Sequence, residues 1–163
     1  MDWLFPIVLF VHVAGAILAF GPTYAFMLLG PMAGSEPQHL NFALRVQKKI
    51  SSTLIAPLAL LQGVTGLTLV ALIGFDILTR GWLLLSIVLY VVLLSIGFLV
   101  LIPSLAILIP ATSAPPPAPP EAGAAPSGPP PHIVAARDRA RMGGMINAVL
   151  ILVIVFLMVT KPF

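Results

Sequence analysis

The chain has 163 residues, of which 60% are hydrophobic and only 8% are charged. Ordinary soluble domains contain about 25% charged residues, so this composition excludes a soluble globular protein, a disordered chain and a nucleic-acid-binding protein. Cysteine is absent, which excludes disulfides, thiolate metal sites and iron–sulfur clusters. The net charge of +3 comes from eight basic and five acidic residues. It bears on orientation in a membrane rather than on the binding of polyanions.

Four long apolar segments organise the chain, and we predict that each one crosses a membrane as a helix. The first three cover about 3–29, 52–75 and 81–109, and the fourth covers about 142–160. A helix needs about 20 residues to cross the hydrocarbon core of a bilayer. No alternation with a period of two suggests a transmembrane barrel. The predicted fold is therefore all-α, a bundle of four transmembrane helices.

A Pro/Ala-rich linker at 110–131 separates the third span from the fourth and contains ten of the 17 prolines. This composition predicts an extended or disordered spacer, because proline lacks the backbone N–H group that a regular helix requires. A docking segment for a proline-binding module is the alternative. Residues 132–163 are predicted to start as a basic juxtamembrane helix and to continue into the fourth span.

The basic residues indicate how the chain is threaded through the membrane. Six of the eight lie in the two long connections, whereas the opposite side has only Arg80 and Lys161. The positive-inside rule then places both connections in the cytoplasm and both termini outside, in the cell (inner) membrane. Trp3 and Trp82 fall at the outer ends of their spans, where aromatic belts form. The six cytoplasmic basic residues are Arg45, Lys48, Lys49, Arg137, Arg139 and Arg141.

Three spans each place one hydrogen-bonding side chain near the midplane of the bilayer. At 1.5 Å per residue, His12 lies roughly 14 Å below the outer boundary marked by Trp3. Similar counts place Gln62 and Tyr90 at a similar depth. Unpaired polar groups in hydrocarbon cost several kcal/mol. We therefore predict that His12, Gln62 and Tyr90 face the interior of the bundle and form one polar layer.

This polar layer has a structural and a functional interpretation. The structural one is interhelical hydrogen bonding. The functional one is a ligand or proton site, because ionisable residues inside a membrane are candidates for function. The layer could hold a quinone or a haem, although a bis-histidine haem needs a second intramembrane histidine and His12 is the only one. No metal site is predicted, because the spans contain no further histidine and no cysteine, and no carboxylate pair is buried for acid–base work because the five acidic residues all lie outside the spans.

Small residues and prolines shape the predicted spans. Small side chains let helices approach closely in lipid, and prolines inside helices produce kinks or hinges. The predicted packing residues are Gly15, Ala19, Gly63 and Gly66. The predicted kinks lie at Pro22, Pro57 and Pro103.

Three motifs resemble those of a known family. They are His12-Val-Ala-Gly-Ala-Ile-Leu-Ala-Phe-Gly-Pro22, Leu61-Gln-Gly-Val-Thr-Gly-Leu67 and Gly81-Trp82-Leu83 at the start of the third span. Together they resemble the DUF2269 family of predicted integral membrane proteins. The likeness covers all four spans but not the proline linker. It implies a four-helix inner-membrane protein and supplies neither a reaction nor catalytic residues.

These features favour a non-enzymatic membrane protein, an accessory or assembly subunit, or a homo-oligomer. Its expected partners are the lipid bilayer and other membrane proteins, with no cofactor and no nucleic acid. One alternative is a quinone- or haem-binding redox subunit that uses the midplane layer. A second alternative is a small transporter or channel with hinges at its prolines.

Overall fold

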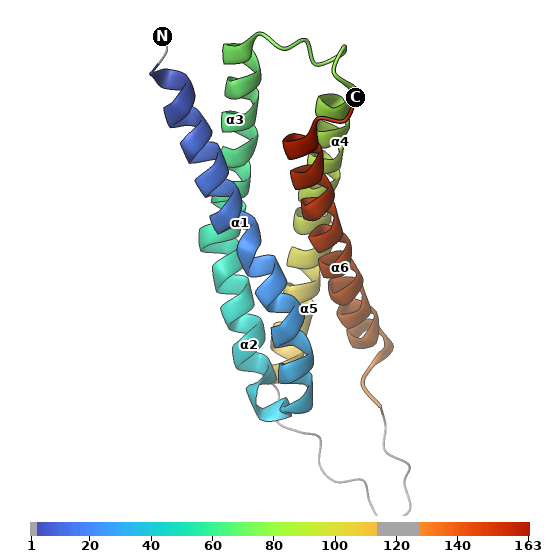
Figure 1. Cartoon of the computed structure of the whole chain (residues 1–163). Helices are drawn as coiled ribbons and strands as arrows, with labels where there is room; N and C mark the ends of the chain where they lie inside the picture. Colours follow the sequence, from blue (N-terminus) through green and yellow to red (C-terminus); the bar gives the residue numbers. More distant parts are fainter. Residues whose placement is uncertain (1–2, 114–127) are drawn as a thin grey trace, which may run out of the picture.

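The computed structural model describes residues 3–113 and 128–163, and every regular element within them is a helix. These elements form four continuous helical rods, each long and apolar enough to cross a membrane (Figure 1). The predicted all-α bundle of four transmembrane helices is confirmed. In chain order the elements are α1 (Leu4–Ser35), α2 (Pro37–Ile50), η1 (Ser51–Ile55), α3 (Ala56–Ile73), α4 (Gly81–Ile96), η2 (Gly97–Leu101), α5 (Ile102–Ser113) and α6 (Pro131–Thr160).

The helices extend well beyond the predicted spans. Helix α1 continues to Ser35, and the polar connection before the second span is itself the helix α2. The second rod, Pro37–Ile73, has 37 residues, or about 55 Å at 1.5 Å per residue. Hydropathy marks where a helix leaves the hydrocarbon core, whereas backbone hydrogen bonds decide where it ends. The same reasoning explains why α5 passes Pro110 and ends at Ser113, inside the predicted linker. Of the rest of that linker, 114–127 lies outside the described residues, 128–130 has no regular structure and Pro131 begins α6.

Local backbone chemistry separates the rods. Glu36 leaves the helical conformation with φ −123° and ψ 76°, and Pro37 then starts α2, where its missing N–H group is no loss. At the other end of the second rod, Gly74 adopts φ 72° and ends α3. Glycine favours this left-handed conformation because it has no Cβ.

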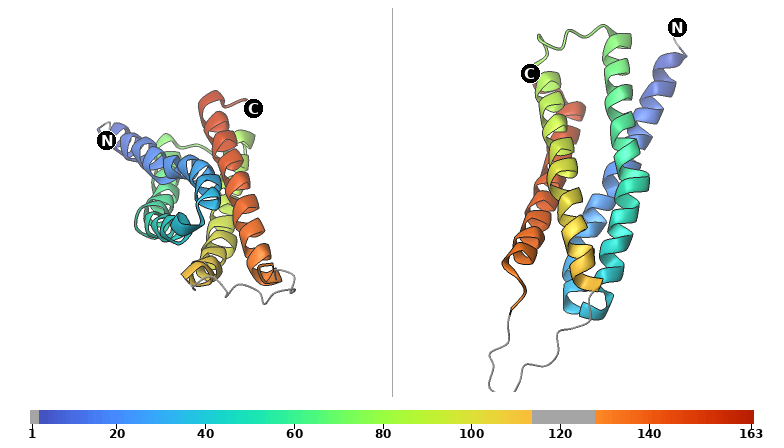
Figure 2. Two further views of the ribbon diagram at one scale, coloured as in Figure 1. Left: turned by 90° about the horizontal axis from the view of Figure 1, so that it is seen from below. Right: turned by 180° about the vertical axis from the view of Figure 1, so that it is seen from behind.

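The bundle consists of two pairs of rods, the first rod with the second and the third rod with the fourth. Helix α1 packs along α3, and α6 packs along α4, η2 and α5. Helix α2 joins the pairs at one end by packing against α1 and α5. Figure 2 shows both pairs from below and from behind. The start of α1 and the end of α6 lie at the same end, and α2 and the first turns of α6 lie at the opposite end (Figure 1). We call this opposite end the basic end, because it carries Arg45, Lys48, Lys49, Arg137, Arg139 and Arg141.

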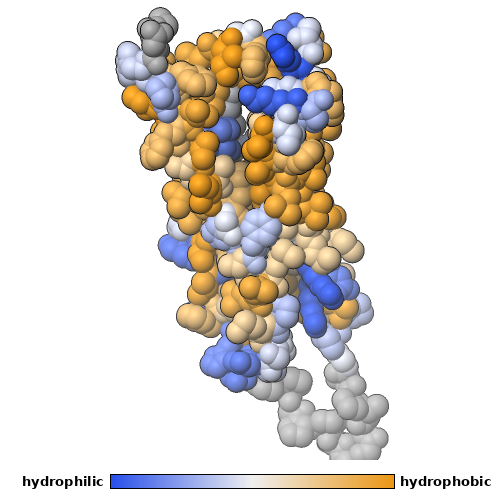
Figure 3. All heavy atoms as spheres, viewed as in Figure 1, coloured by the Kyte–Doolittle hydropathy of each residue, from blue (hydrophilic) through white to orange (hydrophobic). Residues whose placement is uncertain are grey.

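Small residues occupy the buried positions of α1, and Trp82, Leu83 and Leu157 form a buried cluster between α4 and α6, while many other large apolar side chains point outward. Ala19 is fully buried and Ala59 is 3% exposed, whereas Phe10 is 71% exposed. The large number of outward-facing apolar side chains suits a bundle whose solvent is lipid, because close helix packing replaces the hydrophobic effect there. Figure 3 shows apolar side chains over most of the visible face, with hydrophilic side chains both toward the basic end and at the upper right of the opposite end.

Of the three prolines predicted to produce kinks, two follow π-helical turns and one lies within a continuous α-helix. Each of the π-helical turns, η1 and η2, ends two residues before a proline, Pro57 and Pro103 respectively. Pro57 and Pro103 cannot donate a backbone hydrogen bond, and prolines and π-helical turns are both common causes of helix bends. Pro22 lies inside α1, which continues past it without a break in its helical assignment.

Candidate functional site

The centre of the α1–α3 contact is a chain of hydrogen bonds around His12. His12 Nε2 lies 3.0 Å from Gln62 Nε2, and His12 Nδ1 lies 2.9 Å from Thr65 Oγ1. Thr65 Oγ1 lies 2.9 Å from the carbonyl oxygen of Leu61. Gln62 and Thr65 are each 9% exposed. The structure therefore brings two of the three predicted midplane residues together and adds Thr65.

The direction of these bonds follows from the donors available. The Thr65 hydroxyl donates to the Leu61 carbonyl, which has no hydrogen of its own. Thr65 Oγ1 is then free to accept a hydrogen bond from His12 Nδ1–H. His12 Nε2 carries no hydrogen in that tautomer and accepts from the Gln62 amide N–H. Every hydrogen bond in this chain is satisfied by a neutral imidazole.

Two glycines make room for these side chains. A Cβ atom on Gly66 would lie 3.1 Å from His12 Cε1, and one on Gly15 would lie 3.1 Å from Gln62 Oε1. Both distances are tighter than ordinary van der Waals contact. The glycines thus let the imidazole and the amide lie against the facing backbone, which keeps α1 and α3 close.

One oxygen in this cluster has no partner. Gln62 Oε1 is buried and makes no hydrogen bond with the described residues, and it points at Gly15. The Cα–H of a glycine is at most a weak donor. An unsatisfied buried acceptor costs about 1–3 kcal/mol. Gln62 Oε1 is therefore the one group of the cluster that remains available to a donor from outside the chain.

Tyr90, the third predicted midplane residue, bonds elsewhere. Its hydroxyl donates to the carbonyl oxygen of Ala59 in α3. A Cβ on Gly63 would lie 3.1 Å from this hydroxyl. Gly63 follows Ala59 by one helical turn, so its missing side chain uncovers the Ala59 carbonyl. Tyr90 thus ties α4 to α3 and makes no hydrogen bond to His12 or Gln62.

Three further polar contacts between helices were not predicted. The Tyr24 hydroxyl donates to the Ala148 carbonyl at 3.0 Å, which joins α1 to α6. Asn41 Nδ2 lies 2.9 Å from the Ile109 carbonyl, which joins α2 to the end of α5. Asn147 Nδ2 donates to a carbonyl of α4 at 3.4 Å, and its Oδ1 is buried without a partner. A polar residue inside an apolar run was the available signal for Tyr24 and Asn147.

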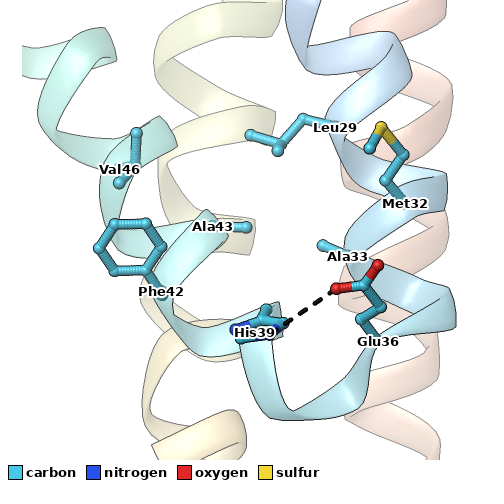
Figure 4. Close-up of a pocket in the computed structure, with 8 residues that line it drawn as sticks. All are labelled: Leu29, Met32, Ala33, Glu36, His39, Phe42, Ala43 and Val46. Carbon is cyan, nitrogen blue, oxygen red and sulfur yellow. Dashed lines mark ion pairs between the residues drawn. The ribbon is translucent and has the colours of Figure 1, made fainter.

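A separate apolar recess of about 310 Å³ lies at the basic end, between the last turns of α1 and the first turns of α2 (Figure 4). Its walls include Leu29, Phe42 and Val46. At one end His39 Nε2 faces Glu36 Oε2 at 3.7 Å. These two side chains are 63% and 55% exposed, so the ion pair contributes little stability.

The chemistry available at the His12 cluster is limited. In the described part of the chain, no three His, Cys, Asp or Glu side chains lie close enough to hold a metal ion together. Among residues 3–113 and 128–163, the side-chain partners of His12 are Thr65 and Gln62, and neither is a carboxylate that could take part in acid–base catalysis. The cluster offers hydrogen bonding between helices, plus one free carbonyl-type acceptor at Gln62.

The family comparison covers nearly the whole chain. The model of a family described as "Predicted integral membrane protein (DUF2269)" matches residues 6–162. The match includes all four rods and the predicted linker. No curated protein and no solved structure matches the chain.

Proposed function

Because the chain belongs to the DUF2269 family of predicted integral membrane proteins, we propose that it is a non-enzymatic subunit of a membrane assembly. It acts through its contacts with other membrane proteins or with further copies of itself. We place it in the inner membrane, with the basic end in the cytoplasm and both termini outside. The positive-inside rule supports this orientation.

One observation carries the proposal. Both ring nitrogens of His12 are used within the chain, one by Gln62 and one by Thr65. A histidine that ligates a metal or transfers a proton needs at least one nitrogen free for that task. His12 instead fixes α1 against α3, which is the work of a structural residue. The outward-facing apolar side chains of the bundle then provide surface for lipid or for neighbouring membrane helices.

A redox subunit is the second candidate, and Gln62 Oε1 is the observation in its favour. This buried oxygen lacks a donor, and a quinol hydroxyl could supply one. His12 is only partly buried, so a ligand could also replace Gln62 at its Nε2. A small transporter is the third candidate, supported by the two π-helical turns beside Pro57 and Pro103, which are natural hinges.

The test begins with the protein purified in mild detergent. Oxidised and dithionite-reduced absorption spectra, metal analysis and lipid extraction are compared for the native chain and His12→Ala. Chemical crosslinking in membranes, followed by mass spectrometry, identifies neighbours. We expect a colourless protein without metal or quinone, which crosslinks to defined membrane proteins or to itself. Tyr24→Phe is the matched control, since it removes a hydrogen bond between helices but leaves His12 intact.

Either of two results would overturn the proposal. A Soret band or stoichiometric quinone that is present in the native chain and in Tyr24→Phe, but lost in His12→Ala, would make His12 a cofactor-binding residue. A protein that stays monomeric and crosslinks only to random neighbours would remove the basis for a role as an assembly subunit.

A further inference from the structure

The apolar recess between α1 and α2 leaves large apolar side chains uncovered (Figure 4). Phe42 and Met32 line it and are 63% and 62% exposed. Ala33 and Ala43 also line it and are buried. The recess is therefore an apolar hollow that no described residue fills.

The recess lies outside the part of the bundle that lipid tails can cover. Phe42 and Ile73 are 31 residues apart on one continuous rod, which corresponds to about 46 Å. Met32 and Leu4 are 28 residues apart on α1, or about 42 Å. The hydrocarbon core is about 30 Å thick, and Lys49, which that core excludes, lies between Phe42 and the apolar helix α3. Phe42 and Met32 therefore face water or the headgroup layer, where a patch of exposed apolar side chains indicates a site of protein contact.

Two basic residues share a face of α2 with this recess. Phe42, Arg45 and Lys49 are all exposed. At about 100° per residue, their spacing places the three side chains within about 60° of one another around the helix axis. Neither Arg45 nor Lys49 has a carboxylate within 4.0 Å among residues 3–113 and 128–163. An apolar anchoring point is thus followed, one and two turns closer to the membrane, by two positive charges.

The charge of the basic end decides which kind of protein fits this face. Six Lys and Arg side chains lie there against only two described carboxylates, those of Glu36 and Asp138. Two copies of the chain that met at this end would bring like charges together, which opposes association. A partner with carboxylates would instead gain from Arg45 and Lys49. Charge complementarity therefore favours an acidic partner over a second copy.

We propose that the recess and the Phe42–Arg45–Lys49 face dock an acidic amphipathic helix of a partner protein. An apolar side chain of that helix enters the recess beside Phe42, as anchors do in other helix-in-groove complexes. Carboxylates farther along the same helix pair with Arg45 and Lys49. This surface deepens the assembly role proposed above and rests on it.

The first measurement establishes what covers the recess. The chain contains no cysteine, so Phe42→Cys provides a single site for a nitroxide label on the full chain in phosphatidylcholine nanodiscs. Val64→Cys is the matched control, because Val64 is also 63% exposed but lies only about 14 Å from Ile73 along α3. A water-soluble nickel chelate should relax the label at position 42, and oxygen should relax the label at position 64. Equal protection of both labels from the nickel chelate would place the recess in lipid tails and overturn the proposal.

The second measurement uses a defined probe, a soluble helical peptide with leucines on one face and glutamates beside them. Its fluorescence anisotropy is followed with the full chain in the same neutral nanodiscs. Phe42→Ala should weaken binding by about tenfold or more, and Arg45→Gln should weaken it by about fivefold. Arg139→Gln is the matched control, because it removes an equal charge at the same end but from α6, and it should weaken binding less than about twofold. Replacement of every glutamate in the peptide by lysine should abolish binding.

The outcomes separate this surface from the assembly role. Equal losses for Arg45→Gln and Arg139→Gln, or no loss for Phe42→Ala, would overturn the docking surface and leave a general attraction between opposite charges. If the peptide does not bind while membrane crosslinking still identifies defined neighbours, the docking surface fails and the assembly role stands. Binding in the predicted order of variants supports the surface, even where crosslinking in membranes finds only random neighbours and the assembly role fails. Phe42 and Arg45 are exposed, so both variants should fold, as judged by elution volume and circular dichroism.

Discussion

Leucine substitutions at the two ends of the His12–Gln62 hydrogen bond should have unequal effects on stability. His12→Leu removes two interhelical bonds, each worth about 0.6 kcal/mol on average in membranes. It also leaves the whole Gln62 amide buried and unpaired, which costs about 1–3 kcal/mol. The expected loss in the free energy of unfolding is about 2–4 kcal/mol.

Gln62→Leu removes only one of these bonds and leaves His12 Nε2, on a partly exposed ring, without its donor, but it also removes the unpaired oxygen Oε1. The two contributions oppose each other, so we expect a change of about 1 kcal/mol or less in either direction. The double variant should then be more stable than His12→Leu alone by about 1–3 kcal/mol, because the stranded amide is gone. Leucine has nearly the volume of either side chain, which limits the contribution of cavities.

The assay is reversible unfolding in mixed micelles with increasing dodecyl sulfate, followed by far-ultraviolet circular dichroism. The four proteins of the double-mutant cycle are measured under one set of conditions. If Gln62→Leu is more destabilising than His12→Leu, Gln62 Oε1 accepts a hydrogen bond in the folded protein. A double variant no more stable than His12→Leu would refute the reasoning about the stranded amide.

Three further substitutions test other contacts of the bundle. Tyr90→Phe should lower the free energy of unfolding by about 1 kcal/mol, because it removes one hydrogen bond to a backbone carbonyl of α3. Gly81→Ala should displace Phe163, since the new Cβ would lie 2.8 Å from its ring. The readout is faster hydrogen exchange at the Trp82 amide, which donates to the Phe163 carbonyl at 3.4 Å. Asn147→Leu should be neutral or stabilising by up to about 1 kcal/mol, because a long bond and an unpaired oxygen disappear together.

A glycine that faces open space provides the control for the alanine substitution. No atom lies within 4 Å of the position that a Cβ on Gly21 would take, so Gly21→Ala should leave exchange at Trp82 unchanged. Slow exchange at Trp82 in Gly81→Ala would mean that the terminal contact is not sensitive to this glycine. A loss of more than 1 kcal/mol for Asn147→Leu would show that its single hydrogen bond outweighs the unpaired oxygen.

The number of helices could be predicted from the sequence, but their lengths could not. Apolar runs end where the membrane ends, and α2 continues the same helix through Arg45, Lys48 and Lys49 because polar residues also support helices in water. The break between the first two rods depends on Glu36 and Pro37, whose effect is local. Nothing in hydropathy distinguishes a polar loop from a polar helix.

Sequence spacing predicts the depth of a side chain in the membrane but not which neighbouring helix the side chain faces. Rise per residue assigns His12, Gln62 and Tyr90 to similar depths, but each side chain also has a direction around its helix axis. In the structure, Tyr90 donates its hydrogen bond to a backbone carbonyl. Because every residue has a backbone carbonyl, the residue type at position 59 does not identify this partner. Gly63 was the available signal, because it uncovers the carbonyl of the residue one turn earlier.

The π-helical turn η1 sets the rotational phase of the second rod. Below the turn, α2 must point Asn41 at the end of α5, and above it α3 must point Gln62 at His12. One residue of an α-helix corresponds to a rotation of about 100°, so an uninterrupted α-helix of the same sequence would aim only one of the two side chains correctly. The extra residue in η1 lets both halves meet their partners. A deletion of one residue in this turn would therefore uncouple the two halves, whereas the same deletion in a loop would be absorbed.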